Sequence, residues 1–163
     1  MEIKDIFITK ADEWGTPKEF FDKLDKEFNF TLDPCGDKSR ILKEGMITWD
    51  ISDNGLTRTW RGHRVYCNPP YSKEHFRLWC EKINQEKEHA DAIVLLMPLR
   101  KLSNKYVHYL ILGFAELRVV KGRLDFYPLK NQDTAAANPS GNAICIMASN
   151  RFRLEQKARR GTK

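Results

Sequence analysis

The sequence of 163 residues lacks any long apolar run, and its first ten residues, MEIKDIFITK, mix charges of both signs. A membrane-spanning helix needs about 20 consecutive apolar residues, and a signal peptide needs an uninterrupted apolar segment. We therefore expect a soluble cytoplasmic protein with no membrane partner. The length and the hydrophobic content of 41% predict one domain over residues 1–150, followed by a basic tail over residues 151–163.

Cysteine and histidine are scarce, with four residues of each kind. The cysteines form no CxxC pair and have no histidines at zinc spacing, which argues against a zinc site and a disulfide framework. We expect reduced thiols, mostly buried as small apolar side chains. No histidine has a partner at triad or metal spacing, so we expect neither a catalytic histidine nor a metal. The residues are Cys35, Cys67, Cys80, Cys145, His63, His75, His89 and His108.

The formal net charge is +6, but most of the chain is nearly neutral. The tail RFRLEQKARRGTK, residues 151–163, holds six basic residues and one acidic residue, so it accounts for five of the six positive charges. Such a tail can follow phosphates by counterion release, or it can be a solvated end that binds nothing.

Alternating strand and helix patterns cover the rest. Thr16-Pro17-Lys18-Glu19 has the capping-box form and predicts a helix start, and Ser72 and Ser103 can begin two further helices. The apolar run of residues 92–97 predicts a central strand, and Lys121-Gly122-Arg123 indicates a hairpin or a sharp reversal. Further strands are expected at residues 28–32, 46–49, 65–67, 117–120, 124–127 and 143–148. The order predicts an α/β three-layer sandwich with a mostly parallel sheet and an antiparallel terminal element.

The stretch VYCNPPYS, residues 65–72, runs a strand straight into an amide, two prolines and an aromatic residue. Proline cannot continue a central ladder, so a rigid loop must begin at the strand end, where open α/β sheets usually place their chemistry. Asn68 and the Pro69 carbonyl can accept both hydrogens of an NH2 group, and Tyr71 offers a flat face. Such contacts favour the nucleophilic form of an adenine amine. The alternative is a tight Pro-Pro turn with a half-buried tyrosine.

Five segments together resemble the phage-type DNA N-6-adenine methyltransferase (Dam-like) family. They are WGTP at 14–17, LDPC at 32–35, VYCNPPYS at 65–72, LLMP at 95–98 and KGRLDF at 121–126. The resemblance implies a Rossmann-like S-adenosylmethionine-dependent methyltransferase fold and a site-specific DNA (adenine-N6) methyltransferase, encoded by a phage or prophage and acting in a bacterial host cell. It also implies that Asn68, Pro69, Pro70 and Tyr71 are catalytic, and that the adenine is flipped out of the duplex.

The resemblance further implies the residues that bind S-adenosyl-L-methionine. Thr16 would contact the methionine end, or it is a plain helix cap, and Asp33 would face the ammonium, or it begins an Asp-Pro turn. The loop after Asp33 has a single glycine, where larger relatives have a GxG-type loop. The implied set is Trp14, Thr16, Pro17, Asp33, Pro34, Cys35, Asp50 and Asn68. Asp50 is the candidate for the ribose hydroxyls and Asp53 the second, although both can be plain loop acids.

DNA contacts are expected from two pairs of cations at strand ends. They are Arg100 with Lys101 and Lys121 with Arg123, which are otherwise solvated surface charges. With no room for a recognition domain, base reading would come from loops such as 100–103 and 128–141. Two alternatives stay open: methylation of RNA or of a protein glutamine by the same motif, and a DNA-binding relative that has lost catalysis. No metal is needed, because the sulfonium already activates the methyl group.

Overall fold

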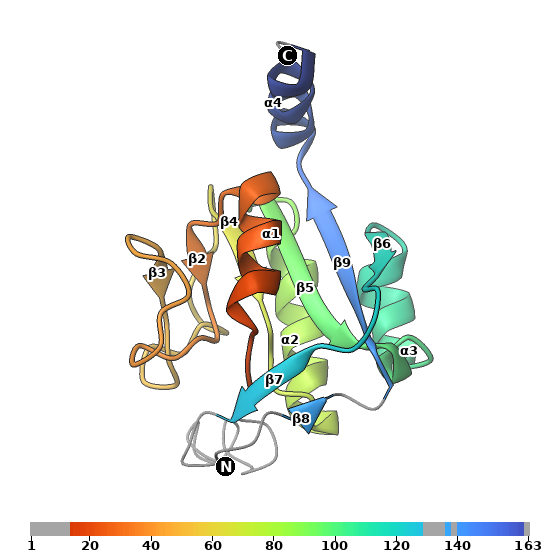
Figure 1. Cartoon of the computed structure of the whole chain (residues 1–163). Coiled ribbons are helices and arrows are strands. Elements are labelled where there is room, and N and C mark those ends of the chain that lie inside the picture. Colours follow the sequence, from red (N-terminus) through yellow and green to blue (C-terminus); the bar gives the residue numbers. More distant parts are fainter. Residues whose placement is uncertain (1–13, 129–135, 138–139, 162–163) are drawn as a thin grey trace.

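A six-stranded sheet forms the centre of the computed structural model, which describes residues 14–128, 136–137 and 140–161 (Figure 1). The strand order is β3-β2-β4-β5-β9-β6. The strands are β3 (Ile47–Thr48), β2 (Leu32–Asp33), β4 (Arg64–Cys67), β5 (Ala92–Pro98), β9 (Asn142–Ala148) and β6 (Glu116–Val119). Neighbours from β3 to β5 are parallel, and β9 is antiparallel to both β5 and β6. The predicted α/β class, with a mostly parallel sheet and a late antiparallel element, is confirmed.

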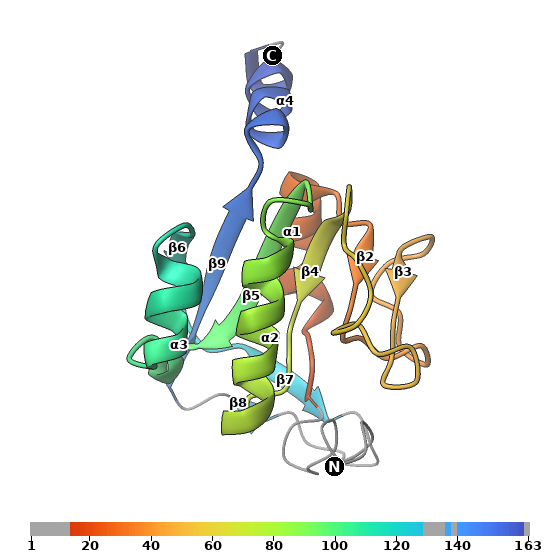
Figure 2. The same cartoon turned by 180° about the vertical axis from the view of Figure 1, so that it is seen from behind.

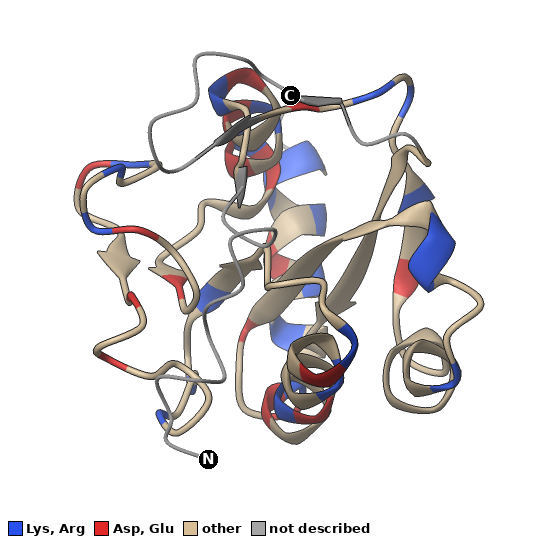
Figure 3. Ribbon diagram, turned by 90° about the horizontal axis from the view of Figure 1, so that it is seen from below, with Lys and Arg blue, Asp and Glu red and all other residues tan. Residues whose placement is uncertain are grey.

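Helices cover both faces of this sheet, as the view from behind and the view from below show (Figures 2 and 3). One face is covered by α1 (Lys18–Phe28) and the other by α2 (Lys73–Glu86) and α3 (Lys105–Val107), which continues as η3 (His108–Leu112). Strand β5 is buried along its whole length. Because side chains alternate along a strand, Val94 and Leu96 pack toward α1, whereas Ile93 and Leu95 pack toward α2.

A second, small sheet crosses below the carboxyl ends of the parallel strands (Figure 1). It consists of β1 (Trp14–Gly15), β7 (Asp125–Pro128) and β8 (Ala136–Ala137), in the antiparallel order β1-β7-β8. The expected hairpin at residues 121–123 is therefore wrong, because β6 pairs with β9 and β7 pairs with β1. Gly122, with φ of +79°, instead turns the chain from one sheet into the other.

Two predicted helix caps and one predicted strand are also wrong. The Thr16 side chain does not cap α1, whose N-cap is Pro17, and α3 is capped by Asn104 Oδ1, which accepts from the Tyr106 amide at 2.9 Å. The strand expected at 28–32 shrinks to Leu32–Asp33. The cause is Asn29, which ends α1 with φ of +49° and leaves the Phe30 amide to donate to Asp25 Oδ1 at 2.7 Å.

A short helix, η2 (Leu99–Lys101), follows β5. The basic C-terminal segment forms α4 (Asn150–Gly161), which extends from the end of β9 (Figure 1). Phe152 is buried and stacks on Phe28 at a centroid distance of 5.9 Å. Gln156 donates to the Glu27 carbonyl at 2.6 Å. Since β9 runs antiparallel to β5, α4 lies at the amino ends of the parallel strands, opposite the small sheet.

Candidate active site at the carboxyl edge of the sheet

The strand order reverses between β2 and β4. The chain passes from β2 outward to β3, and from β4 in the other direction to β5, so the loops that follow β2 and β4 diverge at this point. Open α/β sheets bind ligands in such a crevice, outside the carboxyl ends of the strands. The thiols of Cys35 and Cys67 are 3.7 Å apart and show that the two loops touch. The predicted LDPC and NPPY segments therefore meet at one place.

Asn68 follows directly on β4, which ends at Cys67 as the two prolines predicted. Its Nδ2 donates to Thr16 Oγ1 at 3.1 Å, and its Oδ1 accepts from the Tyr71 hydroxyl at 2.5 Å. Pro69 is buried and Pro70 is half-buried, so the loop backbone has little freedom. Both the nitrogen and the oxygen of the Asn68 side-chain amide are thus hydrogen-bonded.

Tyr71 points its hydroxyl inward rather than presenting a free aromatic face. The hydroxyl also lies 3.1 Å from the Leu96 carbonyl of β5, and the ring packs edge-on against Phe76 at 6.0 Å. Burial raises the pKa of Tyr71 well above its usual value, so the phenol stays protonated and acts as a donor at neutral pH. In this arrangement the Tyr71 hydroxyl occupies Oδ1 of Asn68, the atom that was expected to accept a hydrogen from the adenine amine.

Asp33 ends β2 and is 5% exposed. Its Oδ1 accepts from the Cys35 amide at 3.2 Å, and no cation within the described ranges pairs with it. Burial raises its pKa to about 7, against the smaller opposing effect of that amide. A buried carboxyl group without a positive partner is suited to receive a cationic ligand.

Two glycines allow the backbone to pack this closely around Asp33. A Cβ atom on Gly36 would lie 2.5 Å from Asp33 Oδ2, and one on Gly55 would lie 2.1 Å from the backbone oxygen of Pro34. The single glycine of the loop after Asp33 is therefore required where it stands. Gly55 was missed by the sequence analysis, because its partner is 21 positions away and no local pattern indicates it.

Cys35 is half-buried beside Asp33, and the other three cysteines are buried, all as free thiols. Burial and the neighbouring Cys67 raise the pKa of Cys35 well above its ordinary value, so the thiol stays neutral. The expectation of reduced cysteines as small buried side chains fits these positions. Among the residues described, no group of three His, Cys, Asp or Glu side chains could hold a metal ion.

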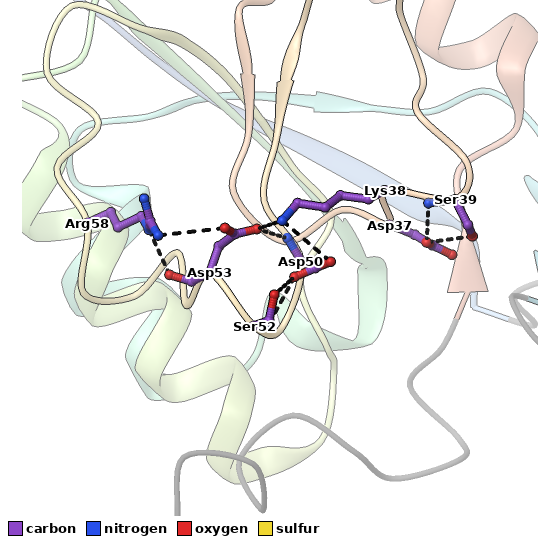
Figure 4. A network of polar contacts seen from close by, with 7 residues as sticks. All are labelled: Asp37, Lys38, Ser39, Asp50, Ser52, Asp53 and Arg58. Atoms are coloured by element: carbon purple, nitrogen blue, oxygen red, sulfur yellow. Dashed lines mark hydrogen bonds and ion pairs between the residues drawn. The ribbon is translucent and has the colours of Figure 1, made fainter.

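Asp50 and Asp53 lie in the loop that follows β3, next to the loop after β2, because the Gly36 amide donates to the Trp49 carbonyl at 2.9 Å. Both carboxylates contact the ammonium group of Lys38 (Figure 4). Asp50 Oδ1 also accepts from the Ser52 amide at 2.9 Å. The hydrogen bond from Lys38 is the main cause that lowers the pKa of Asp53. Asp50 stays the candidate for a sugar hydroxyl, in a position already ordered by its own loop.

Trp14, Thr16 and Pro17 lie where β1 leads into α1. Thr16 is buried, and its hydroxyl is 2.8 Å from the hydroxyl of Tyr66. Tyr66 was not predicted as a site residue, although it lies in β4 two positions before Asn68, and residues two apart in extended chain point to the same side. This two-residue spacing is the sequence feature that could have indicated Tyr66 as a site residue.

The four predicted DNA-contact residues all lie at the carboxyl edge. Arg100 and Lys101 form η2 directly after β5, and the Lys101 ammonium lies 5.2 Å from the centre of the Phe76 ring. Lys121 and Arg123 follow β6, which is parallel to β5. They line a cleft of about 590 Å³ against the start of α1, and Figure 3 shows basic residues on α1 and on the turn that precedes β7.

No helix among the described residues is long and apolar enough to cross a membrane. The model of the DNA N-6-adenine-methyltransferase (Dam) family matches residues 5–160. The chain is also 32% identical, over 88 residues, to a DNA N-6-adenine-methyltransferase of Haemophilus phage HP1. That match covers 53% of this chain and 49% of the phage protein, so the chain spans about half the length of this relative. With a methyltransferase-like sheet, an NPPY loop at its switch point and a family match over nearly all its residues, the chain belongs to the DNA N-6-adenine-methyltransferase (Dam) family.

Proposed function

We propose that this protein transfers a methyl group from S-adenosyl-L-methionine to the N6 amine of adenine in DNA. The observation that supports this most directly is the placement of Asn68. Its amide stands at the carboxyl end of β4, beside the buried carboxyl group of Asp33 across the switch point of the sheet. An acceptor for an amine and an acceptor for a cation therefore lie on neighbouring loops.

Asn68 and the Pro69 carbonyl hold the amine through its two hydrogens. Oδ1 of Asn68, now bonded to the Tyr71 hydroxyl, accepts one hydrogen of the amine after Tyr71 turns away. Hydrogen bonds of this kind draw the nitrogen toward a pyramidal geometry in which its lone pair is available. Neither group takes up the proton that leaves the amine, so that proton passes to water. Once turned outward, the Tyr71 ring can stack on the base and fix its plane.

Asp33 fits the cofactor for a reason independent of the motif. Its carboxyl group is buried without a cation among the described residues, and its pKa is raised to about 7. The ammonium of the methionine moiety would supply the missing positive charge and favour the ionised carboxylate. Asp33, the backbone around Cys35, and Asp50 would hold the cofactor, which provides an electrophilic methyl group on a positively charged sulfur.

DNA is the proposed substrate, with the target adenine flipped out because its amine is inaccessible inside the stack. Arg100, Lys101, Lys121 and Arg123 stand at the same edge of the sheet as Asn68. In this position they can contact phosphates on either side of a flipped nucleotide. These contacts orient the duplex without reading its sequence.

The test is mass spectrometry of nucleosides from unmethylated duplex DNA incubated with the purified protein and S-adenosylmethionine. The unmutated protein should form N6-methyladenine, and Asn68→Ala should form none. Asn84→Ala is the matched control, because it removes an amide from the end of α2 far from the carboxyl edge. Equal methylation by Asn68→Ala would refute the role of the loop. Methylation of RNA or of protein glutamine, but not of DNA, would reassign the substrate.

A further inference from the structure

A buried chain of hydrogen bonds connects Asn68 to the interior of the protein. Asn68 Nδ2 donates to Thr16 Oγ1 at 3.1 Å, and the Thr16 hydroxyl lies 2.8 Å from that of Tyr66. Thr16 is 7% exposed and Tyr66 is fully buried. The three residues come from the start of α1, from within β4 and from the loop after β4. We infer that Thr16 and Tyr66 are positioning residues that set the orientation of the Asn68 amide toward the substrate.

The inference rests on the proposed function and follows from the polarity of an amide. Asn68 can hold an amine only if Oδ1 faces it, because the nitrogen end of the side chain donates and cannot accept. With Oδ1 toward the substrate, Nδ2 must find an acceptor on the opposite side. Thr16 Oγ1 is that acceptor. Removing this acceptor would break the hydrogen bond that keeps Nδ2 on the side away from the substrate.

Tyr66 completes the chain as the hydrogen-bond partner of the Thr16 hydroxyl. A threonine hydroxyl can also donate, and a donating Thr16 would attract Oδ1 and turn the amide the wrong way. If the Thr16 hydroxyl donates to the Tyr66 oxygen, its lone pairs are left for Asn68 Nδ2. The direction of donation then runs from the amine to Asn68, from Asn68 to Thr16, and from Thr16 to Tyr66.

Tyr66 is well placed for this role because the core fixes its ring. The ring packs edge-on against Phe21 at 5.2 Å and against Phe30 at 5.4 Å. Burial raises its pKa well above the ordinary value, so its hydroxyl stays neutral. Through Thr16, a hydroxyl fixed on the central sheet thus holds the Asn68 side chain at the start of the loop that follows β4.

The test compares Thr16→Val, which removes the hydroxyl at nearly constant shape, with Thr16→Ser, which keeps it. The helix start should tolerate both, because the Thr16 side chain makes no capping hydrogen bond. We expect kcat to fall at least about tenfold in Thr16→Val and to change less than about twofold in Thr16→Ser. Calorimetry of S-adenosylmethionine binding separates this role from the cofactor contact that the family resemblance implies for Thr16: a positioning role lowers kcat in Thr16→Val without weakening cofactor binding in parallel. Thermal melting verifies that each variant is folded.

A double-mutant cycle tests the part of Tyr66. Tyr66→Phe should lower kcat in the unmutated background and have no further effect in Thr16→Val, because Tyr66 acts through Thr16. Independent, multiplying effects would overturn the inference. So would an unchanged kcat in Thr16→Val, or a loss confined to cofactor affinity, which would make Thr16 a cofactor ligand. A lack of methylation by the unmutated protein would instead refute the proposed function itself.

Discussion

Asp33→Asn should make the protein more stable while impairing its site. The pKa of Asp33 is raised from 3.8 to about 7 by burial, so the charged form is disfavoured in the folded state. A pKa difference of about 3, at about 1.4 kcal/mol for each tenfold factor, corresponds to about 4 kcal/mol at pH 8. Asparagine keeps the acceptor for the Cys35 amide and carries no charge. The variant should therefore avoid this destabilisation.

The sign of the pH dependence follows from the direction of the shift. Because the folded state binds the proton more tightly than the unfolded state, Asp33 destabilises the fold increasingly as pH rises from about 4 to about 7, and equally above that. The stability advantage of Asp33→Asn should be small near pH 4, about 1.7 kcal/mol at pH 5, and about 4 kcal/mol at pH 8. Urea denaturation at these pH values measures it, provided that unfolding is two-state.

A control of opposite sign is available in the same region. The pKa of Asp53 is lowered, chiefly by its hydrogen bond from Lys38, so its charged form stabilises the fold at neutral pH. Asp53→Asn should thus be destabilising at pH 8, and the loss should shrink as pH falls. Parallel stability curves for Asp33→Asn and the unmutated protein from pH 5 to 8 would refute the argument for a buried, unpaired carboxyl group.

The same variant tests the proposed role of Asp33 in cofactor binding. An ammonium ligand favours the ionised carboxylate, so binding of S-adenosylmethionine near pH 6.5 should release protons from the unmutated protein. Calorimetry in buffers of different ionisation enthalpy measures that release. Asp33→Asn should bind more weakly and lack the Asp33 part of the release. Equal affinity and equal proton release in the two proteins would remove Asp33 from the cofactor site.

Three further substitutions test other features of the structure. Gly55→Ala should lower stability by about 2 kcal/mol or more and disturb the loop after β2, since the new methyl group would meet the Pro34 carbonyl at 2.1 Å; thermal melting and cofactor titration measure both effects. Glu86→Ala should cost about 3–5 kcal/mol in urea denaturation, because it leaves the buried Lys82 ammonium, now 2.6 Å away, without its partner. Asn142→Leu should gain about 1–3 kcal/mol in the same assay, because both polar atoms of this buried amide lack a partner among the described residues; a loss of stability would contradict that assignment.

The position of the NPPY loop was predictable because its signal is steric and local. Prolines end a strand wherever they occur, so Pro69 and Pro70 fix the end of β4 without reference to the rest of the fold. The apolar run of β5 was equally clear, because only a central strand buries every residue. An apolar run and a proline, which lacks an N–H group, can both be recognised in the sequence without knowing which residues they contact in the fold.

Thr16 shows why local patterns fail elsewhere. The capping box is a pattern of four residues, yet the Thr16 hydroxyl bonds to Tyr66 and Asn68, which lie 50 and 52 positions away. A hydroxyl at a helix start has several partners of similar energy, and tertiary packing decides among them. The expected hairpin at Gly122 failed for a related reason. A glycine with positive φ predicts a reversal, but it does not specify which strands pair on either side.

The location of α4 separates the net charge of the protein from its candidate site. β5 has seven residues, so the two edges of the sheet are about 20 Å apart, which corresponds to about six base pairs of DNA. The basic residues of α4 lie at the amino edge, whereas Asn68 lies at the carboxyl edge. The phosphates beside a nucleotide bound at Asn68 are therefore out of reach of α4. In the proposed complex they would be met by the cations of the carboxyl edge, whose charges are balanced by acidic residues elsewhere in the chain, so net charge alone could not have located the site.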